Sequence, residues 1–175
     1  TRLKYRLTDR VVSISPEISS ILDQSGMCFG SPVISSAVKE KKLNIERALA
    51  LKKTFDIQDN VKIIGLISAL TAEKDPFISL KVVSELQKTR QDFVVFHFGS
   101  GVLFDQVSDM IKELDLAQFY FQMGHQENVE DYFSIMDVFL MTSKEEGLGS
   151  SVLDAFNYEV SVVSTDAGGL NSLVR

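Results

Sequence analysis

The segment Phe93-Val-Val-Phe-His-Phe98, which runs directly into Gly99-Ser-Gly101, decides the fold of this chain. Five of its first six residues are apolar, with no alternation between apolar and polar positions. A strand that is apolar on both faces is typical of a parallel sheet covered by helices on both sides. The segment therefore predicts a buried strand, and the glycines predict a turn where the chain leaves it.

Four further apolar runs share this pattern, and each ends in a polar or glycine-rich break. Helical patterns separate the runs: Phe77–Arg90 repeats apolar residues at three-residue steps behind Pro76. Gln106–Leu114 and Val129–Ile135 are weaker examples of the same pattern. Such connections suit crossovers between parallel strands, so we predict an α/β fold with a Rossmann-like, doubly wound parallel sheet and helices on both faces. The four runs are Val61–Leu66, Phe119–Phe121, Val138–Met141 and Val160–Ser164.

The N-terminal quarter of the chain has a different organisation. Arg10–Ile14 reads as a strand, and Ser15-Pro16 then starts a helix, with serine as the cap and proline at the first position, that ends near Gly26. Residues 27–43 are irregular, and Asn44 caps a second helix. The irregular stretch predicts a boundary between two structural units. The second helix places on one face Ile45, Ala48, Leu49 and Phe55.

Composition excludes several classes of protein. The chain has 18 Lys and Arg against 24 Asp and Glu, a net charge of −6, which argues against binding nucleic acid. The short basic run Lys39–Lys42 is interpreted as a solvated face. A single cysteine, Cys28, allows no internal disulfide and favours a reducing compartment. No apolar run approaches the roughly 20 residues of a membrane span. Since the chain opens on Thr1 and stops after Arg175, we expect a piece of a longer protein.

The unusual residues cluster where the predicted strands end. Ligands of open α/β sheets bind outside the carboxyl ends of the strands, where successive loops meet. Any one glycine there is ordinary turn chemistry, but five such loops together predict a binding crevice. The loops carry Lys74, Gly99 with Gly101, Gly124 with His125, Ser143–Gly149 and Thr165–Gly169.

The segment Glu145–Asn157 (EEGLGSSVLDAFN) predicts a ligand in that crevice. We expect a helix from Gly149, with an apolar face formed by Val152, Leu153 and Phe156. Glu146, Ser150 and Asp154 are spaced by four and would share the opposite face over roughly 12 Å. Amides of the first turn favour an anion, and acids accept hydrogen bonds from hydroxyls, which suits a sugar nucleotide. The alternative is that Glu146 complements the helix dipole and Asp154 is merely exposed.

Ser143–Phe156 resembles the hallmark of the retaining glycosyltransferase family 4 (group 1), in which two glutamates stand eight positions apart around a Gly-Phe-Gly. The resemblance covers about residues 57–175 and is specific in several loops. It implies a GT-B fold, in which two Rossmann-like domains face each other across a cleft. The other matching segments are Ile64–Pro76 with the family's lysine loop, Phe96–Gly101, Phe121–Ser143 and Val163–Val174 with its double glycine.

The resemblance implies roles for individual residues. Glu146 would contact the hydroxyls of the donor sugar, and Asp154, in place of the family's second glutamate, those of the ribose. Lys74 would neutralise the departing diphosphate. The remaining donor-binding positions would be Gly147, Leu148, Gly149, Ser150, Gly99, Gly101, Gly124, His125, Gly168 and Gly169. Two positions depart from the family pattern: Ala69 stands where an arginine is usual, and Ser172 where an acid is common.

The resemblance also implies a domain arrangement. Residues 1–35 would be the tail of an N-terminal acceptor domain or an interdomain segment, residues 36–56 a linker and helix, and residues 57–175 the donor domain without its C-terminal end. The donor would be a UDP- or GDP-sugar, with no obligatory cofactor and no metal. An acceptor glycan or lipid-linked sugar would bind through the missing domain. The setting would be cytoplasmic, with peripheral association at the inner face of a bacterial membrane.

Two other functions stay open at this point. A nucleotide-sugar epimerase would share the architecture, with further catalytic residues from a missing domain. A non-catalytic α/β binding domain would need no reaction, although a receiver-type domain would need paired acids that Leu66–Leu70 lacks. His97 lies inside an apolar strand, so we interpret it as a buried histidine with a hydrogen-bond partner.

Overall fold

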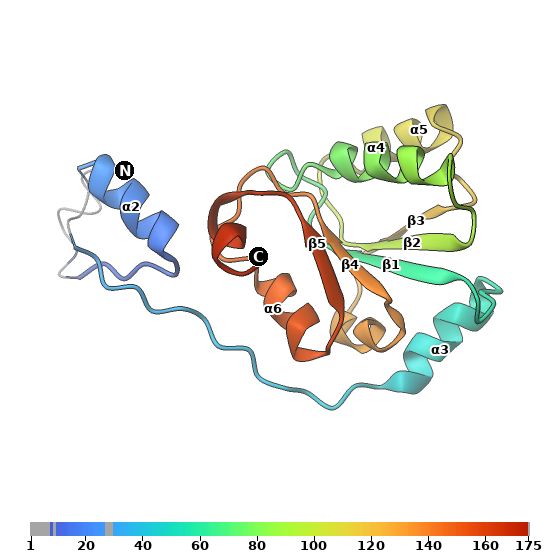
Figure 1. The fold of residues 1–175 in the computed structure, drawn as a ribbon, viewed down its shortest axis with the longest axis horizontal. Coiled ribbons are helices and arrows are strands. Elements are labelled where there is room, and N and C mark those ends of the chain that lie inside the picture. Colours follow the sequence, from blue (N-terminus) through green and yellow to red (C-terminus); the bar gives the residue numbers. More distant parts are fainter. Residues whose placement is uncertain (1–7, 9, 27–29, 175) are drawn as a thin grey trace.

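The computed structural model describes residue 8, residues 10–26 and residues 30–174. Its centre is a five-stranded sheet in the order β3-β2-β1-β4-β5, and every neighbouring pair of strands is parallel (Figure 1). This architecture confirms the predicted α/β fold with a Rossmann-like sheet. The strands are β1 Lys62–Ile67, β2 Phe93–Phe98, β3 Tyr120–Gly124, β4 Val138–Met141 and β5 Ser161–Ser164.

Helices cover both faces of the sheet (Figure 1). Helices α4 and α5 lie on one face, and α3, α6 and the 3-10 helix η1 lie on the other. Helix α2 contacts the second 3-10 helix, η2. None of the described helices combines the length and apolar character needed to cross a membrane. Their bounds are α2 Pro16–Gln24, α3 Ile45–Thr54, α4 Pro76–Gln87, α5 Phe104–Glu113, η1 Val129–Ile135, α6 Ser150–Asn157 and η2 Gly168–Ser172.

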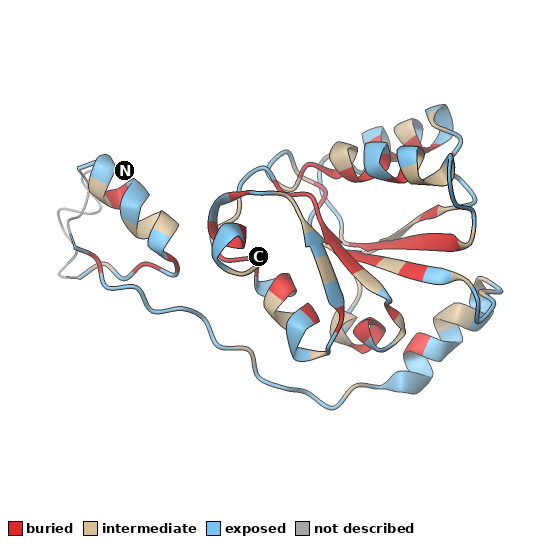
Figure 2. Ribbon diagram, viewed as in Figure 1, coloured by how far each residue is buried: buried red, intermediate tan, exposed pale blue. Residues whose placement is uncertain are grey.

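The core lies in two apolar layers, one on each side of the sheet. Strand β2 contributes to both, and all six of its residues are buried (Figure 2). Phe93 and Val95 face the layer under α4 and α5, whereas Phe96 and Phe98 face the opposite layer. Strand β2 lies between β1 and β3 and is covered by helices on both faces, which explains why it is almost entirely apolar.

The prediction of a strand at Arg10–Ile14 is wrong. The segment forms a single parallel bridge between Ser13 and Val33, in which Ser13 donates to the Pro32 carbonyl. Ser15 turns the chain directly into α2, its side chain accepting from the amide of Ile18 as predicted for the cap. The ladder does not extend because Pro32 has no N–H to donate.

Two predicted helix faces are partly wrong. In α3, Ala48 is fully buried, but Ile45 and Leu49 are exposed because the helix packs on η1 through a narrow stripe. In α6, the buried residues are Val152 and Ala155. Phe156 is 43% exposed, because the small Ala155 brings the helix onto the sheet along a stripe that excludes the position after it.

His97 of β2 belongs to a buried polar chain that links the sheet to α4. Its Nδ1 lies 2.6 Å from the Tyr120 hydroxyl, which lies 2.9 Å from Ser79 Oγ, and its Nε2 lies 3.0 Å from Ser68 Oγ. Ser79 in turn donates to the Pro76 carbonyl. Nε2 also lies 3.2 Å from the Ser68 carbonyl oxygen, so both ring nitrogens have polar partners. The prediction of a satisfied buried histidine is confirmed.

Burial lowers the pKa of His97 to about 4 from its usual 6.5. As pH falls below 6.5 the unfolded state takes up this proton and the native state does not, so stability is lost. We expect the chain to lose about 2 kcal/mol more than His97→Gln between pH 7 and pH 5. Urea denaturation at both pH values measures the difference, and equal losses in the two proteins would contradict it.

The loops that follow β4 and β5 pack backbone against backbone. The amide of Gly169 donates to the Glu146 carbonyl at 2.8 Å. A Cβ on Gly169 would lie 2.3 Å from the Gly147 carbonyl oxygen, and one on Gly168 would lie 2.2 Å from that of Glu146. Gly168 also has φ +51°, in the left-handed region. Side chains at the double glycine would therefore push the two loops apart.

Gly169→Ala is expected to lower the free energy of unfolding by roughly 2 kcal/mol or more, because its Cβ would clash with backbone atoms rather than with a movable side chain. Gly168→Ala adds left-handed strain to the same kind of clash, and Gly26→Ala is its matched control, since Gly26 also has positive φ but open space around it. Left-handed strain alone costs about 1–2 kcal/mol. Thermal denaturation compares the stability of these variants, and a nucleotide-binding assay compares their affinity. Unchanged stability in Gly169→Ala would show that the loops separate freely.

Candidate functional site

The loops at the carboxyl ends of the strands are joined to one another. The amide of Gly99 after β2 donates to the Gly124 carbonyl of β3 at 2.8 Å. The amide of Lys144 after β4 donates to the Glu73 carbonyl of the β1 loop, also at 2.8 Å. Thr165 Oγ1 after β5 donates to the Ser143 carbonyl at 2.6 Å. The amide of Leu70 after β1 donates to the Ser100 carbonyl after β2 at 3.1 Å, so all five loops form one connected rim.

Lys74 and Glu146 form the central ion pair of this rim. Lys74 Nζ donates to Glu146 Oε2, and Ser143 Oγ donates to the same oxygen at 3.2 Å. Glu146 is only 12% exposed and Lys74 27% exposed, so both side chains are partly shielded from water. Partial shielding strengthens their attraction relative to a surface pair. The arrangement sets a cation and an acceptor-rich carboxylate side by side at the rim.

The lysine loop is held by neighbouring polar contacts. Asp75, at the N-cap position of α4, is buried with φ +41°, and its carboxylate pairs with Lys144 at 2.9 Å rather than capping the helix. Thr142 Oγ1 donates to the Asp75 carbonyl at 3.2 Å. These contacts join the loop after β1 to the loop after β4. Together with the Lys144–Glu73 hydrogen bond, they fix the backbone on either side of Lys74, so its side chain starts from a defined position.

Glu146 does not lie on a helix, which corrects the expectation that it shares a helical face with Ser150 and Asp154. Helix α6 begins at Ser150, after Gly149 in a left-handed conformation with φ +78°. That conformation interrupts the helical path, and the Glu146 carbonyl is engaged by the double-glycine loop instead. Ser150 and Asp154 do share α6, one turn apart.

The start of α6 is suited to an anion. Gly149 stands at the N-cap and offers no side-chain acceptor to the amides of the first turn. Such amides carry the positive end of the helix dipole. Leu148, in contrast, is buried at 7% exposure, so its side chain serves packing rather than the rim.

Asp154 lies in a second polar cluster, on the far part of α6. It lines a cavity of about 80 Å³ together with Lys41, Glu130 and Tyr158. Burial and, next, the Glu130 carboxylate raise the pKa of Asp154, whereas Lys41 lowers it. The Lys41 side chain forms an ion pair with Glu130. Asp154 is thus a half-buried acid whose charge depends on two neighbours.

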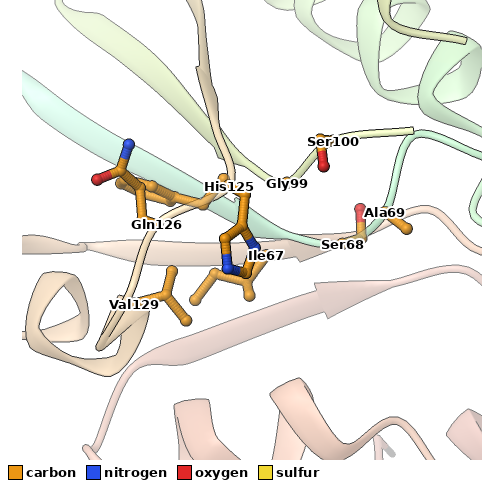
Figure 3. Close-up of a pocket in the computed structure, with 9 residues that line it drawn as sticks. Ile67, Ser68, Ala69, Gly99, Ser100, His125, Gln126 and Val129 are labelled. Carbon is orange, nitrogen blue, oxygen red and sulfur yellow. The ribbon is translucent and has the colours of Figure 1, made fainter. Parts of the chain in front are cut away.

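A larger cavity of about 270 Å³ adjoins that of Asp154, because Ile67 and Val129 line both (Figure 3). It opens at the carboxyl ends of β1 and β2, and the His125 ring lies beside Ile67. Predicted residues Gly99 and His125 line it, and so does Ala69, where the resemblance expects an arginine. The complete lining is Ile67, Ser68, Ala69, Phe98, Gly99, Ser100, His125, Gln126 and Val129.

The predicted residues fall into three groups. Lys74 and Glu146 meet in one ion pair, Gly99 and His125 line the larger cavity, and Asp154 lines the smaller one. Other predicted glycines serve contacts between loops: Gly101 lies against the Leu70 carbonyl, and Gly124, Gly168 and Gly169 pair or pack with neighbouring loop backbone.

Sequence reasoning missed Lys41, Glu130 and Tyr158. Lys41 is 64% exposed, as the solvated-face interpretation predicts, but it also pairs with Glu130 at the Asp154 cavity. Nothing in the local pattern links positions 41 and 130. Within the described ranges, no group of three or more His, Cys, Asp and Glu side chains is placed to hold a metal ion.

Known proteins share both the sequence pattern and the fold. The chain matches the family described as glycosyl transferases group 1 over residues 49–175. It is 25% identical over 125 residues, 71% of this chain, to N-acetyl-alpha-D-glucosaminyl L-malate synthase of Bacillus anthracis. It is 23% identical over 181 residues, 99% of this chain, to the lipopolysaccharide core biosynthesis mannosyltransferase LpsB of Rhizobium meliloti.

A crystal structure of Anabaena Alr3699/HepE in complex with UDP and glucose has the same fold, with a TM-score of 0.83 and 17% identity over the whole of this chain. The chain spans 51% of that protein, 32% of the Bacillus anthracis relative and 50% of LpsB. It therefore corresponds to a third to a half of these relatives. The family match covers most of the chain and includes the entire sheet and rim. The chain belongs to the glycosyl transferases group 1 family.

Proposed function

We propose that this chain is the donor-binding part of a retaining glycosyltransferase of family 4, with the GT-B arrangement. Residues 57–175 bind the nucleotide sugar, residues 36–56 are a linker and helix, and residues 1–35 belong to the end of the acceptor domain or to the interdomain segment. The observation that carries the proposal is the partly buried Lys74–Glu146 pair on the rim shared with the first turn of α6.

The donor is a nucleoside diphosphate sugar. Asp154 accepts from the ribose hydroxyls, and the cavity beside His125 takes the base. Amides at Ser150 and the cation of Lys74 meet the diphosphate, while Glu146 accepts from sugar hydroxyls. UDP is favoured over GDP because the similar Anabaena protein is described in complex with UDP and glucose.

The transfer breaks the bond between the anomeric carbon and the phosphate oxygen, and the electron pair leaves with the nucleoside diphosphate. The acceptor hydroxyl gives its proton to the departing phosphate oxygen, and its oxygen bonds to the same face of the sugar, so the configuration is retained. Lys74 and the α6 amides act by stabilising the charge that develops on the leaving phosphate. Because Ala69 stands at the position of the family's arginine, Lys74 carries a larger share of this stabilisation.

The acceptor is a glycan or a lipid-linked sugar held by a partner domain. The relative LpsB is described as acting in lipopolysaccharide core biosynthesis, which favours a surface glycan as the product. We propose a cytoplasmic location with peripheral association at the inner face of a bacterial membrane.

Isothermal titration calorimetry of the chain with UDP and UMP tests the donor site. Lys74→Ala is expected to weaken UDP binding about tenfold or more and UMP binding less, because hydrogen bonds to charged groups contribute roughly 1.5–3 kcal/mol. Asp154→Asn is expected to weaken both nucleotides, since both carry the ribose diol.

Lys112→Ala is the matched control, because Lys112 is an exposed lysine on α5 that is 74% exposed. It is expected to bind both nucleotides like the unaltered chain. Absence of binding of UDP, GDP and their sugars at millimolar concentration would refute the donor-site proposal. Equal loss of UDP and UMP in Lys74→Ala would refute the diphosphate role of Lys74.

A further inference from the structure

Residues 36–56, the proposed linker, pass beside the small cavity of Asp154. Lys39 and Lys41 line this cavity, and the linker forms several hydrogen bonds and ion pairs there. The Lys41 amide donates to the Tyr158 hydroxyl at 3.3 Å, and Lys41 Nζ pairs with the Glu130 carboxylate. Tyr158 stands one turn after Asp154 on the same side of the chain. The linker backbone therefore lies at the ribose end of the proposed donor site.

Contacts at the start of α3 strengthen this attachment. The Asn44 amide donates to Asp131 Oδ1 at 2.8 Å, and Arg47 Nη1 donates to the Glu127 carbonyl at 2.8 Å. Arg47 also forms an ion pair with the buried Asp131 at 3.5 Å. The segment 41–47 is thus joined to 127–131, the stretch that leads from His125 to Glu130.

Glu130 and Asp154 line the same small cavity, so their two negative charges repel each other. Like charges at such a site disfavour ionisation of one another, and a cation between them relieves this. The Lys41 hydrogen bond lowers the pKa of Glu130, and the Glu130 charge raises the pKa of Asp154 after burial has done so. Lys41 also lowers the pKa of Asp154 directly, so the cation that pairs with Glu130 in this cavity offsets the repulsion between the two carboxylates.

We propose that Lys41 is a positioning residue of the donor site: by holding Glu130 in an ion pair, it leaves the Asp154 carboxylate to accept hydrogen bonds from the vicinal diol of a ribonucleoside diphosphate. This inference rests on the proposed function and adds the linker to the site. The linker would then contribute to recognition of the ribose of the nucleotide, in addition to connecting two domains.

The test measures UDP and 2′-deoxy-UDP binding by titration calorimetry on four proteins: the unaltered chain, Lys41→Ala, Lys41→Ala with Glu130→Gln, and Lys42→Ala. Lys42 is the exposed neighbour that serves as the control. Lys41→Ala is expected to weaken UDP about threefold to fivefold, the range of a largely exposed ion pair. Its preference for UDP over the deoxy nucleotide is expected to shrink.

The second substitution separates charge from architecture. Glu130→Gln removes the repelling carboxylate, so the double variant is expected to recover UDP affinity to within about twofold of the unaltered chain. Unchanged UDP affinity in Lys41→Ala, or no recovery in the double variant, would overturn the role of Lys41 while leaving the donor site intact. Absence of UDP binding by the unaltered chain would instead overturn the proposed function itself, and this role with it.

Discussion

The five strands all run in one direction, and the rest of the structure depends on that constraint. Each carboxyl end opens at the same rim, so residues as far apart as Lys74 and Glu146, 72 positions along the chain, become neighbours. Backbone hydrogen bonds between those loops turn the rim into a single surface. The sheet can be parallel because both of its faces are covered by helices, and its interior strand β2 is buried throughout.

Polar chemistry on this rim is arranged in pairs rather than as isolated charges. Lys74 is matched by Glu146, Lys144 by Asp75, and Lys41 by Glu130. Each pair joins two segments that are far apart in the sequence, so electrostatic attraction also fixes the shape of this region. The pairs differ in exposure, and the most shielded of the three cationic groups is Lys74, which strengthens its interaction with a charged ligand.

The sequence predicts the sheet well because a short run such as Phe93–Phe98, rich in valine and phenylalanine and followed by glycine, favours a buried strand over a helix. It also predicts which loops meet, since that follows from strand direction alone. The prediction for Glu146 is wrong. The spacing of four residues suggests a helix that includes Glu146, but Gly149 has a left-handed conformation and the helix begins only after it. Glycine can adopt a positive φ but does not have to, so the sequence alone does not predict the conformation of Gly149.

The link between Lys41 and Glu130 could not be predicted for a different reason. The two residues are 89 positions apart and meet through the path of an irregular segment, which has no periodicity to read. Arg10–Ile14 shows the reverse error, since an apolar run suggested a strand where Pro32 prevents a ladder from extending. Local pattern thus predicts elements with a repeat, and tertiary contacts determine the rest.

Strand β5 lies at one border of the described sheet, and its outer backbone groups face away from β4. A border of this kind is a template onto which another extended segment can add by backbone hydrogen bonding. The template is four residues long, and the side chain of Val163 is 56% exposed beside it. Addition of a further strand beside β5 would therefore widen the sheet and cover part of the exposed Val163 side chain.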